Sequence, residues 1–320
     1  MNKKINNSAP IKIDCKKLFN IDSVFAVMGF SQSDSNVPLL DENYIFDQKT
    51  TQAILAGFAF NQRVLVQGMH GTGKSSHIEQ IAARLNWPCL RVNFDSQITR
   101  LDLVGKDIIT IKNDKQITEF KEGIIPFALR NGYALVLDEY DAIKTDVSFV
   151  IQRLLEENGK FTLLEENEII TPHPNFRLFA TSNTLGAGDD LGIYHGTNLI
   201  KQAQMDRWNI VVALNYLHEE QEMQILQKKL AFLLKDHDKS LFKMMIKLAN
   251  LSRDAFRNGD LSNLISLRTL ISWGNNIAIF KNIKEAFILS FYNKIIDDEK
   301  PIIQEFYQRV FGEEIISKNS

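Results

Sequence analysis

The sequence has few cysteines, no long apolar run and almost no net charge, and each lack excludes a class of protein. Only Cys15 and Cys89 are cysteines among 320 residues, and they stand far apart outside any CxxC pattern, which argues against a disulfide framework or structural zinc site and fits the cytosol. No uncharged apolar run approaches the ~18 residues of a membrane span. Lysine plus arginine total 37 and aspartate plus glutamate 39, a formal net charge of -2, so the basic excess of many nucleic-acid-binding proteins is missing. We therefore expect a cytoplasmic protein with no membrane and no nucleic acid among its partners.

What the sequence does contain, from residue 37 to residue 214, is an alternation of short apolar runs with amphipathic stretches. Five runs have the composition of strands: RVLVQG, CLRVNFD, ALVLDE, RLFATSN and NIVVAL. Most consist of Val, Leu and Ile without strict alternation, which is typical of a parallel sheet covered by helices on both faces. Between the first two runs, the apolar residues follow the i, i+3, i+4, i+7 spacing of a helix, at Ile78, Ile81, Ala82 and Leu85. The pattern predicts a three-layer α/β domain over residues 37–214.

Other parts of the chain have different patterns. Residues 105–123 and 159–176 each predict a hairpin inserted into the sheet domain. Residues 215–320 have almost no strand signal and predict a smaller α-helical domain, whose last helix (301–315) carries apolar residues on one face. That face either packs on its own domain, as such faces more often do, or docks a partner. Residues 1–36 predict an N-terminal segment or small module.

A glycine-rich stretch lies between the first predicted strand and the helix that follows it. Gly68 to Ser75 reads GMHGTGKS and matches GxxxxGK[ST], in the strand–loop–helix context that this motif requires. Glycines allow successive N–H groups to point at phosphate oxygens, and the helix N-terminus adds its partial positive charge. Lys74 can then reach the β- and γ-phosphates, and the Ser75 hydroxyl can ligate Mg²⁺. The alternative is a glycine-rich turn that binds nothing. We expect a nucleotide site formed by Gly68, Met69, His70, Gly71, Thr72, Gly73, Lys74, Ser75 and Ser76.

Two later runs end in polar residues that such a site needs. ALVLDE ends in Asp138, which can hold the Mg²⁺, and Glu139, which can deprotonate an attacking water. RLFATSN ends in Asn183, whose amide could hold that water if its strand lies beside the Asp138 strand. Without the phosphate loop, Asp138 and Glu139 would be read as solvated acids at a strand end. Asn183 would be read as an ordinary turn residue. Together with the phosphate loop, these residues predict Mg²⁺ bound by Ser75 and Asp138, with Glu139 and Asn183 as catalytic residues.

These motifs, followed by AQMDRW and SLRT, occur in the order of an AAA+ ATPase. The two predicted hairpins fit the helix-2 insert and the pre-sensor-1 hairpin of the MoxR and magnesium-chelatase branch. Longer stretches, above all HGTGKSSHIEQIAARLNWPC and QAQMDRWNIVVALNYL, resemble the ATPase subunits of aerobic cobaltochelatases, the CobS type. The likeness runs from about residue 21 to residue 311, nearly the whole chain.

The resemblance implies an AAA+ P-loop fold, ATP and Mg²⁺ as cofactors, and a homo-oligomeric ring, expected to be a hexamer. It implies two partners, a MIDAS-type chelatase subunit (CobT type) and a large tetrapyrrole-binding subunit (CobN type). With them such enzymes insert Co²⁺ into hydrogenobyrinic acid a,c-diamide during cobalamin biosynthesis. Arg207 matches the arginine finger that reaches a neighbour's γ-phosphate, and Arg268 matches sensor 2, acting in its own site or a neighbour's. A local ion pair of Arg207 with Asp206 and a surface role for Arg268 are the alternatives.

Other functions stay open at this point. A MoxR-like chaperone that remodels another metalloprotein would share the same motifs. A nucleic-acid-dependent motor is disfavoured by the near-neutral charge, and a binding module with a dead ATP site by the intact motifs. The histidines form no spaced ligand cluster, so we expect no cobalt site in this chain from His70, His77, His173 and His195.

Overall fold

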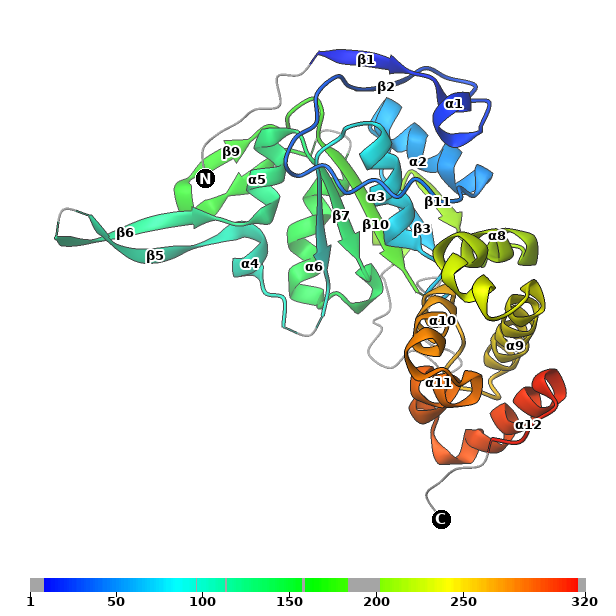
Figure 1. Ribbon diagram of the computed structural model, residues 1–320. Coiled ribbons are helices and arrows are strands. Elements are labelled where there is room, and N and C mark those ends of the chain that lie inside the picture. Colours follow the sequence, from blue (N-terminus) through cyan, green and yellow to red (C-terminus); the bar gives the residue numbers. More distant parts are fainter. Residues whose placement is uncertain (1–8, 96, 113, 157–158, 184–201, 316–320) are drawn as a thin grey trace.

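A five-stranded parallel sheet forms the centre of the larger part of the protein. The computed structural model describes residues 9–95, 97–112, 114–156, 159–183 and 202–315. The strands follow the order β11-β3-β10-β7-β4, and every neighbouring pair is parallel (Figure 1). The five expected strands are confirmed as β3 (Val64–Gln67), β4 (Cys89–Asn93), β7 (Ala134–Asp138), β10 (Arg177–Ser182) and β11 (Ile210–Ala213).

Helices cover both faces of the sheet because both faces are apolar. Successive strand residues divide between two cores: Leu65 and Leu137 belong to one, whereas Val66 and Val136 belong to the other, and all four are 0% exposed. The first core includes residues of α4 (Arg100–Val104), α5 (Ile124–Asn131) and α6 (Thr145–Gln152). The second includes residues of α2 (Gln48–Phe60) and α3 (Lys74–Arg84). The predicted three-layer α/β architecture is therefore confirmed.

The N-terminal residues share the second of these cores. β1 (Pro10–Ile13) and β2 (Val27–Phe30) pair as antiparallel strands, with α1 (Cys15–Phe19) between them. Apolar side chains from all three elements are buried against α2 and α3 or packed at their edge. The N–H of Phe30 donates to the carbonyl oxygen of Leu85, 2.8 Å away, at the end of α3. This contact ties the segment to the helix that begins in the phosphate loop.

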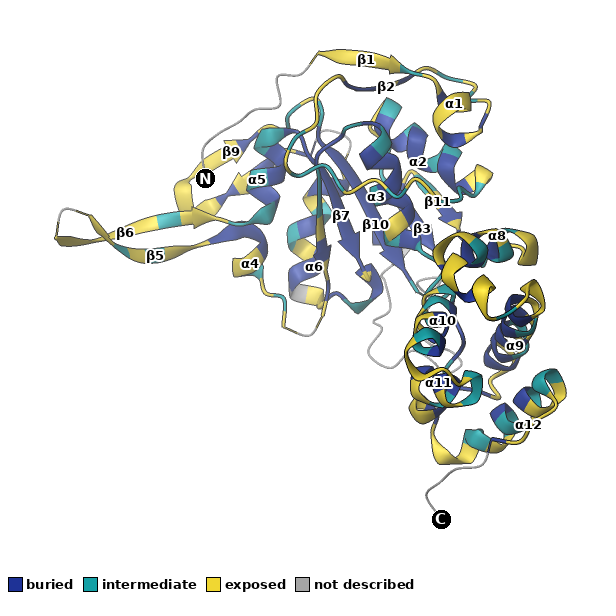
Figure 2. Ribbon diagram, viewed as in Figure 1, coloured by how far each residue is buried: buried dark blue, intermediate teal, exposed yellow. Residues whose placement is uncertain are grey.

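Both predicted hairpins are confirmed. β5 (Gly105–Lys112) and β6 (Lys115–Glu122) pair antiparallel along their whole length and project far from the sheet domain (Figure 1). Most of their residues are exposed, as the yellow ribbon in Figure 2 shows. The second hairpin is shorter and pairs β8 (Phe161–Leu163) with β9 (Glu168–Ile170).

A helical body follows the sheet domain and lies at the end of the sheet where its strands have their carboxyl ends (Figure 1). Its core surrounds Trp273 and Phe287. Ile303 and Tyr307 of the last helix are buried in this core, so the apolar face of that helix packs on its own domain. No described helix combines the length and the apolar character needed to cross a bilayer. The helices after β10 are α7 (Gln202–Met205), α8 (Glu219–Lys229), α9 (Lys239–Asn258), α10 (Leu267–Phe280), α11 (Ile283–Ser290) and α12 (Lys300–Phe311).

Candidate functional site

The loop between β3 and α3 turns on glycines. Gly71 and Gly73 have φ angles of 75° and 89°, in the left-handed region where a residue with a Cβ is strained. A side chain on Gly68 would overlap the carbonyl oxygen of Leu214. Gly73 directly precedes Lys74, the first residue of α3, so the unpaired N–H groups of the helix start adjoin the loop. The loop therefore has the backbone form of an anion-binding turn, at the carboxyl edge of a parallel sheet.

Lys74 is almost completely buried, with 7% of its surface exposed. Its ammonium group donates to the carbonyl oxygens of Gly68 (2.7 Å) and Met69 (3.0 Å) and to Oδ1 of Asn183 (2.8 Å). Burial lowers the pKa of Lys74 to about 8, although nearby carboxylates act to raise it. The expected convergence of the phosphate loop and Asn183 on one point is thus present in the structure.

Asp138, at the end of β7, accepts hydrogen bonds on both carboxylate oxygens. Oδ1 accepts from the hydroxyl of Ser75, 2.6 Å away, and from the hydroxyl of Thr181. Oδ2 accepts from Nε of Arg91, 2.9 Å away, and from the same guanidinium's Nη2. The sequence predicts the meeting of Ser75 and Asp138. It gives no signal for Arg91 or Thr181, because one such residue within a strand has no distinguishing spacing.

Glu139 and Asn183 follow two strands that pair directly, β7 and β10, which meets the condition set for Asn183 in the sequence analysis. Glu139 is exposed and has a φ of 55°, uncommon for a residue with a side chain and a form of strain that clusters at functional sites. Its N–H donates to Oγ1 of Thr181 (3.1 Å). Desolvation, and then the charges of Asp138 and Asp141, raise the pKa of Glu139. Asp141, a buried acid that the sequence reading did not single out, accepts from the N–H of Asn183 (3.0 Å).

A cavity of about 420 Å³ lies between the loop and the helical body, a volume in the range of small-molecule sites. Arg268, exposed at the start of α10, lines it from the helical body, and Tyr44 lines it from the segment before α2. Lys74 and Asp138 are not among its lining residues. The cavity adjoins the phosphate loop, and its lining includes the acids Asp41, Asp47, Glu79 and Glu222. From the loop it is lined by Gly71, Thr72 and Gly73, and from α3 by Ser76, His77, Glu79 and Gln80.

Met69 and His70 contribute main-chain oxygens rather than side-chain groups. The carbonyl oxygen of Met69 accepts from the hydroxyl of Thr72 (2.9 Å) as well as from Lys74. The ring of His70 packs edge-on against Phe256 of α9, with ring centroids 5.8 Å apart. Its carbonyl oxygen accepts from the hydroxyl of Tyr216, 2.6 Å away. The loop thus contacts the helical body, and the glycine-rich motif alone does not predict this contact.

Arg207 contacts residues of its own chain. Its Nη1 and Nη2 lie 3.1 and 3.0 Å from the side-chain oxygen of Gln152 on α6, when that amide is oriented to accept. Its charge also acts on the hydroxyl of Tyr140, directly after Glu139. Arg207 is not among the residues that line the cavity.

The oxygen atoms at this site fit a magnesium ion. Ser75 and Asp138 present a hydroxyl and a carboxylate, ligands that Mg²⁺ prefers, beside a loop built for phosphate. Within the described ranges, no group of three or more His, Cys, Asp or Glu side chains is arranged to hold a metal ion. His77 is buried and bonded to Thr51 (2.8 Å) and Tyr44 (3.1 Å), and burial lowers its pKa to about 4, so it is a neutral structural residue. His195 lies outside the described residues.

Comparison with known proteins agrees with this architecture. Residues 63–207 match the AAA domain of the dynein-related subfamily, and residues 222–305 match the CbbQ/NirQ/NorQ C-terminal domain. The parallel sheet, the phosphate loop and these two domains define a protein of the AAA+ P-loop class.

Within that class, the chain belongs to the family of the aerobic cobaltochelatase subunit CobS. It is 52% identical over 311 residues to that subunit from Sinorhizobium sp, a match covering 97% of this chain and 94% of the relative. Midasin from Dictyostelium discoideum is 32% identical over 168 residues, which are 52% of this chain and 3% of midasin. Among solved structures, a Thermotoga maritima RuvB mutant is similar with a TM-score of 0.48 at 15% identity, covering 84% of this chain and 77% of that one.

Proposed function

We propose that this chain is the ATP-hydrolysing subunit of a cobaltochelatase. One observation carries the proposal: Lys74 at the start of α3, Asp138 at the end of β7 and Asn183 just after β10 meet at one edge of the sheet in a chain of the CobS family. An ammonium group, a carboxylate and an amide beside a phosphate loop are the groups that P-loop enzymes use in phosphoryl transfer.

Each group has a proposed role in hydrolysis. Lys74 and the N–H groups of residues 71–75 bind the β- and γ-phosphates, and Ser75 and Asp138 hold Mg²⁺. When bound, Mg²⁺ offsets negative charge on the phosphates. Glu139 accepts a proton from the attacking water, a task that its raised pKa suits. Asn183 orients that water, and its carbonyl oxygen is already fixed by Lys74.

The cavity and the two remaining arginines complete the proposed site. Its volume of about 420 Å³ and its position next to the loop suit the nucleoside part of ATP. Arg268 lies at the edge of this cavity, where it can reach phosphate in its own site or a neighbour's. Arg207 serves as the arginine finger for the adjoining subunit of a ring, for which we propose six members.

The proposed partners follow from the family. A MIDAS-type subunit (CobT type) and a large tetrapyrrole-binding subunit (CobN type) would work with the ring in the cytoplasm, and Co²⁺ would be their substrate for insertion into hydrogenobyrinic acid a,c-diamide. Hydrolysis would shift the helical body against the sheet domain. The exposed β5–β6 hairpin is in a position to pass that motion to a partner.

The test combines hydrolysis with reconstitution. Wild-type protein, Glu139→Gln and the control Glu313→Gln, an exposed acid with 64% of its side chain accessible, are assayed for ATP hydrolysis and for binding of a fluorescent ATP. We expect Glu139→Gln to bind ATP but to lose hydrolysis by roughly 100-fold or more. With both candidate partners, wild type and Glu313→Gln should support ATP-dependent cobalt insertion, followed by the absorbance of the macrocycle, and Glu139→Gln should not.

Two outcomes overturn different parts of the proposal. Wild-type protein that neither binds nor hydrolyses ATP with magnesium, even with its partners, removes the ATPase assignment. Active ATPase that retrieves neither partner and inserts no cobalt removes the chelatase assignment and favours a MoxR-like chaperone of another metalloprotein. Stimulation of ATP hydrolysis by DNA would instead favour a nucleic-acid-dependent motor.

A further inference from the structure

Tyr216 joins the phosphate loop to the helical body. It stands on the short segment between β11 and α8 and is half-buried. Its hydroxyl donates to the carbonyl oxygen of His70 across 2.6 Å. His70 lies in the middle of the phosphate loop, so this bond acts on a peptide group of the segment proposed to bind phosphate.

The bond fixes the direction of the next amide. The described chain contains no cis peptide bond, so the peptide between His70 and Gly71 is trans and planar. In such a peptide the carbonyl oxygen and the following N–H point in opposite directions. Because Tyr216 holds the His70 oxygen, the N–H of Gly71 points away from Tyr216. Gly71 has a φ of 75°, and a glycine adopts positive and negative φ about equally readily, so the residue's own preference does not fix this peptide.

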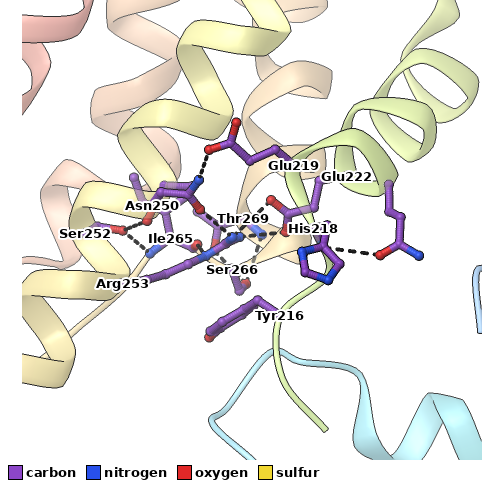
Figure 3. Close-up of polar contacts among 12 residues, drawn as sticks. Tyr216, His218, Glu219, Glu222, Asn250, Ser252, Arg253, Ile265, Ser266 and Thr269 are labelled. Carbon is purple, nitrogen blue, oxygen red and sulfur yellow. Dashed lines mark hydrogen bonds and ion pairs between the residues drawn. The ribbon is translucent and has the colours of Figure 1, made fainter. Parts of the chain in front are cut away.

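A buried arginine holds the Tyr216 ring in turn. The guanidinium carbon of Arg253 lies 4.2 Å from the ring centroid, within cation–π range. Arg253 is 2% exposed and forms a double hydrogen bond with Glu222, itself 1% exposed, at 3.0 and 2.9 Å. Figure 3 shows this pair beside Tyr216, between α8 and α9. A buried fork pair of this kind fixes the guanidinium plane, and the ring stacks on a fixed surface.

Arg253 also positions another contact between the helical body and the loop. Its Nε donates to the carbonyl oxygen of Ile265, 3.0 Å away. The next residue, Ser266, caps α10, and a Cβ on Gly71 would overlap its side chain. Tyr216 and Ser266 therefore contact two consecutive loop residues, and one arginine positions both.

We propose that Tyr216 is a positioning residue for phosphate binding: its hydroxyl keeps the Gly71 N–H directed at the phosphates, while Arg253 and Glu222 hold the ring in place. This inference rests on the proposed function, since it concerns the same nucleotide site. It assigns a role in phosphate recognition to a residue of the connecting segment that lies outside the glycine-rich motif.

The test removes one oxygen atom. Tyr216→Phe keeps the ring over Arg253 and loses only the hydroxyl. The matched control is Tyr292→Phe, which removes the hydroxyl that accepts from Gln304 (2.7 Å), away from the loop in the core of the helical body. Affinities for fluorescent ADP are measured directly, and those for adenosine and for tripolyphosphate by competition. Melting temperatures show whether either variant is unfolded.

In Tyr216→Phe, we expect the affinities for ADP and tripolyphosphate to fall about fivefold to tenfold, the loss expected for one hydrogen bond, while adenosine binds as in wild type. Tyr292→Phe should match wild type for all three ligands. Unchanged ADP affinity in Tyr216→Phe overturns the inference. An equal loss for adenosine and ADP also overturns it, because Tyr216 lines the cavity proposed for the nucleoside and would then act there rather than on an amide. If the wild type binds no nucleotide, the proposed function itself fails, which is a distinct result.

Discussion

Arg91 and Asp138 form an ion pair at the carboxyl edge of the sheet, with Nε of the arginine 2.9 Å from Oδ2 of the aspartate. The carboxylate expected to hold Mg²⁺ therefore carries a cation on one oxygen and two hydroxyl donors on the other. Arg91 also lies 3.8 Å from Glu79 on α3, so a second acid is available to it. We therefore predict that Mg²⁺ and the guanidinium compete for Asp138, with Glu79 as the alternative partner of Arg91.

Arg91→Met should therefore lower the Mg²⁺ concentration needed for half-maximal nucleotide binding, by roughly threefold to tenfold, because the attraction between Arg91 and Asp138 no longer opposes the metal. Titration of Mg²⁺ into protein with fluorescent ATP measures it. Arg130→Met is the control, since Arg130 pairs with Glu122 and Glu168 beside the hairpins. An unchanged or higher Mg²⁺ requirement in Arg91→Met would show that the pair does not compete with the metal.

Nucleotide affinity should depend on pH through Lys74. Burial lowers its pKa to about 8, and bound phosphates, being anionic, raise it again. Binding then takes up a proton wherever the free protein has lost it, so affinity is full only well below pH 8 and falls as pH rises through 8. Between pH 7.5 and pH 9 we expect a loss approaching tenfold. Calorimetry in buffers of different ionisation enthalpy should show uptake of close to one proton at pH 9. A flat affinity over this range contradicts the assignment.

The close approach of Gly71 to Ser266 predicts that Gly71→Ala weakens ADP binding and that a second substitution at Ser266 restores it. Gly71→Ala places a Cβ both in left-handed backbone and against Ser266. Gly312→Ala is a matched control, because Gly312 has a φ of 73° but nothing within 4 Å of its built Cβ. Each variant should lose roughly 1–2 kcal/mol of stability from backbone strain. Gly71→Ala alone should also weaken ADP binding at least tenfold.

Ser266→Gly should restore most of that affinity in the double variant, because glycine removes the Cβ and still serves at a helix N-cap at little cost. Fluorescent ADP binding measures the recovery. Failure of the double variant to recover would mean that the defect of Gly71→Ala arises within the loop and not from the helical body.

Arg207→Ala should bind nucleotide within about twofold of wild type but hydrolyse ATP at least 100-fold more slowly, the scale of an arginine-finger loss. Mixing it with Lys74→Ala should recover part of the activity, because some interfaces then combine an intact loop with an intact arginine. Phosphate release measures both effects. Arg309→Ala, an exposed arginine at the end of α12, should behave as wild type. A mixture no more active than the sum of its components would place Arg207 outside the shared site.

The central fold and its main polar residues can be predicted from the sequence because each has a local pattern. Val- and Leu-rich runs such as ALVLD mark strands buried on both faces, and the GxxxxGK[ST] spacing marks the loop. Asp138 and Asn183 stand out as polar residues at the ends of two such runs, whereas the pairing of their strands comes from the structure. Such patterns involve residues that are close together in the sequence, so one sequence is enough to recognise them.

Residues that meet only through the strand order leave no such pattern. Arg91 reads as an ordinary polar residue in a strand, and only the pairing of β4 with β7 brings it to Asp138. Tyr216 and His70 are 146 positions apart, and nothing in either local sequence indicates their bond. Likewise, Arg253 and Glu222 look like members of solvated helix faces, whereas tertiary packing buries both.

The strand order also determines when each strand can pair during synthesis of the chain. β3 ends at Gln67, yet both its neighbours, β10 and β11, begin only at Arg177 and Ile210. During synthesis from the N-terminus, β3 therefore emerges with two open edges and stays unpaired while more than a hundred further residues are added. Open apolar edges invite pairing with other chains. A nascent chain of this protein is therefore expected to aggregate more readily before β10 and β11 have been synthesised than after.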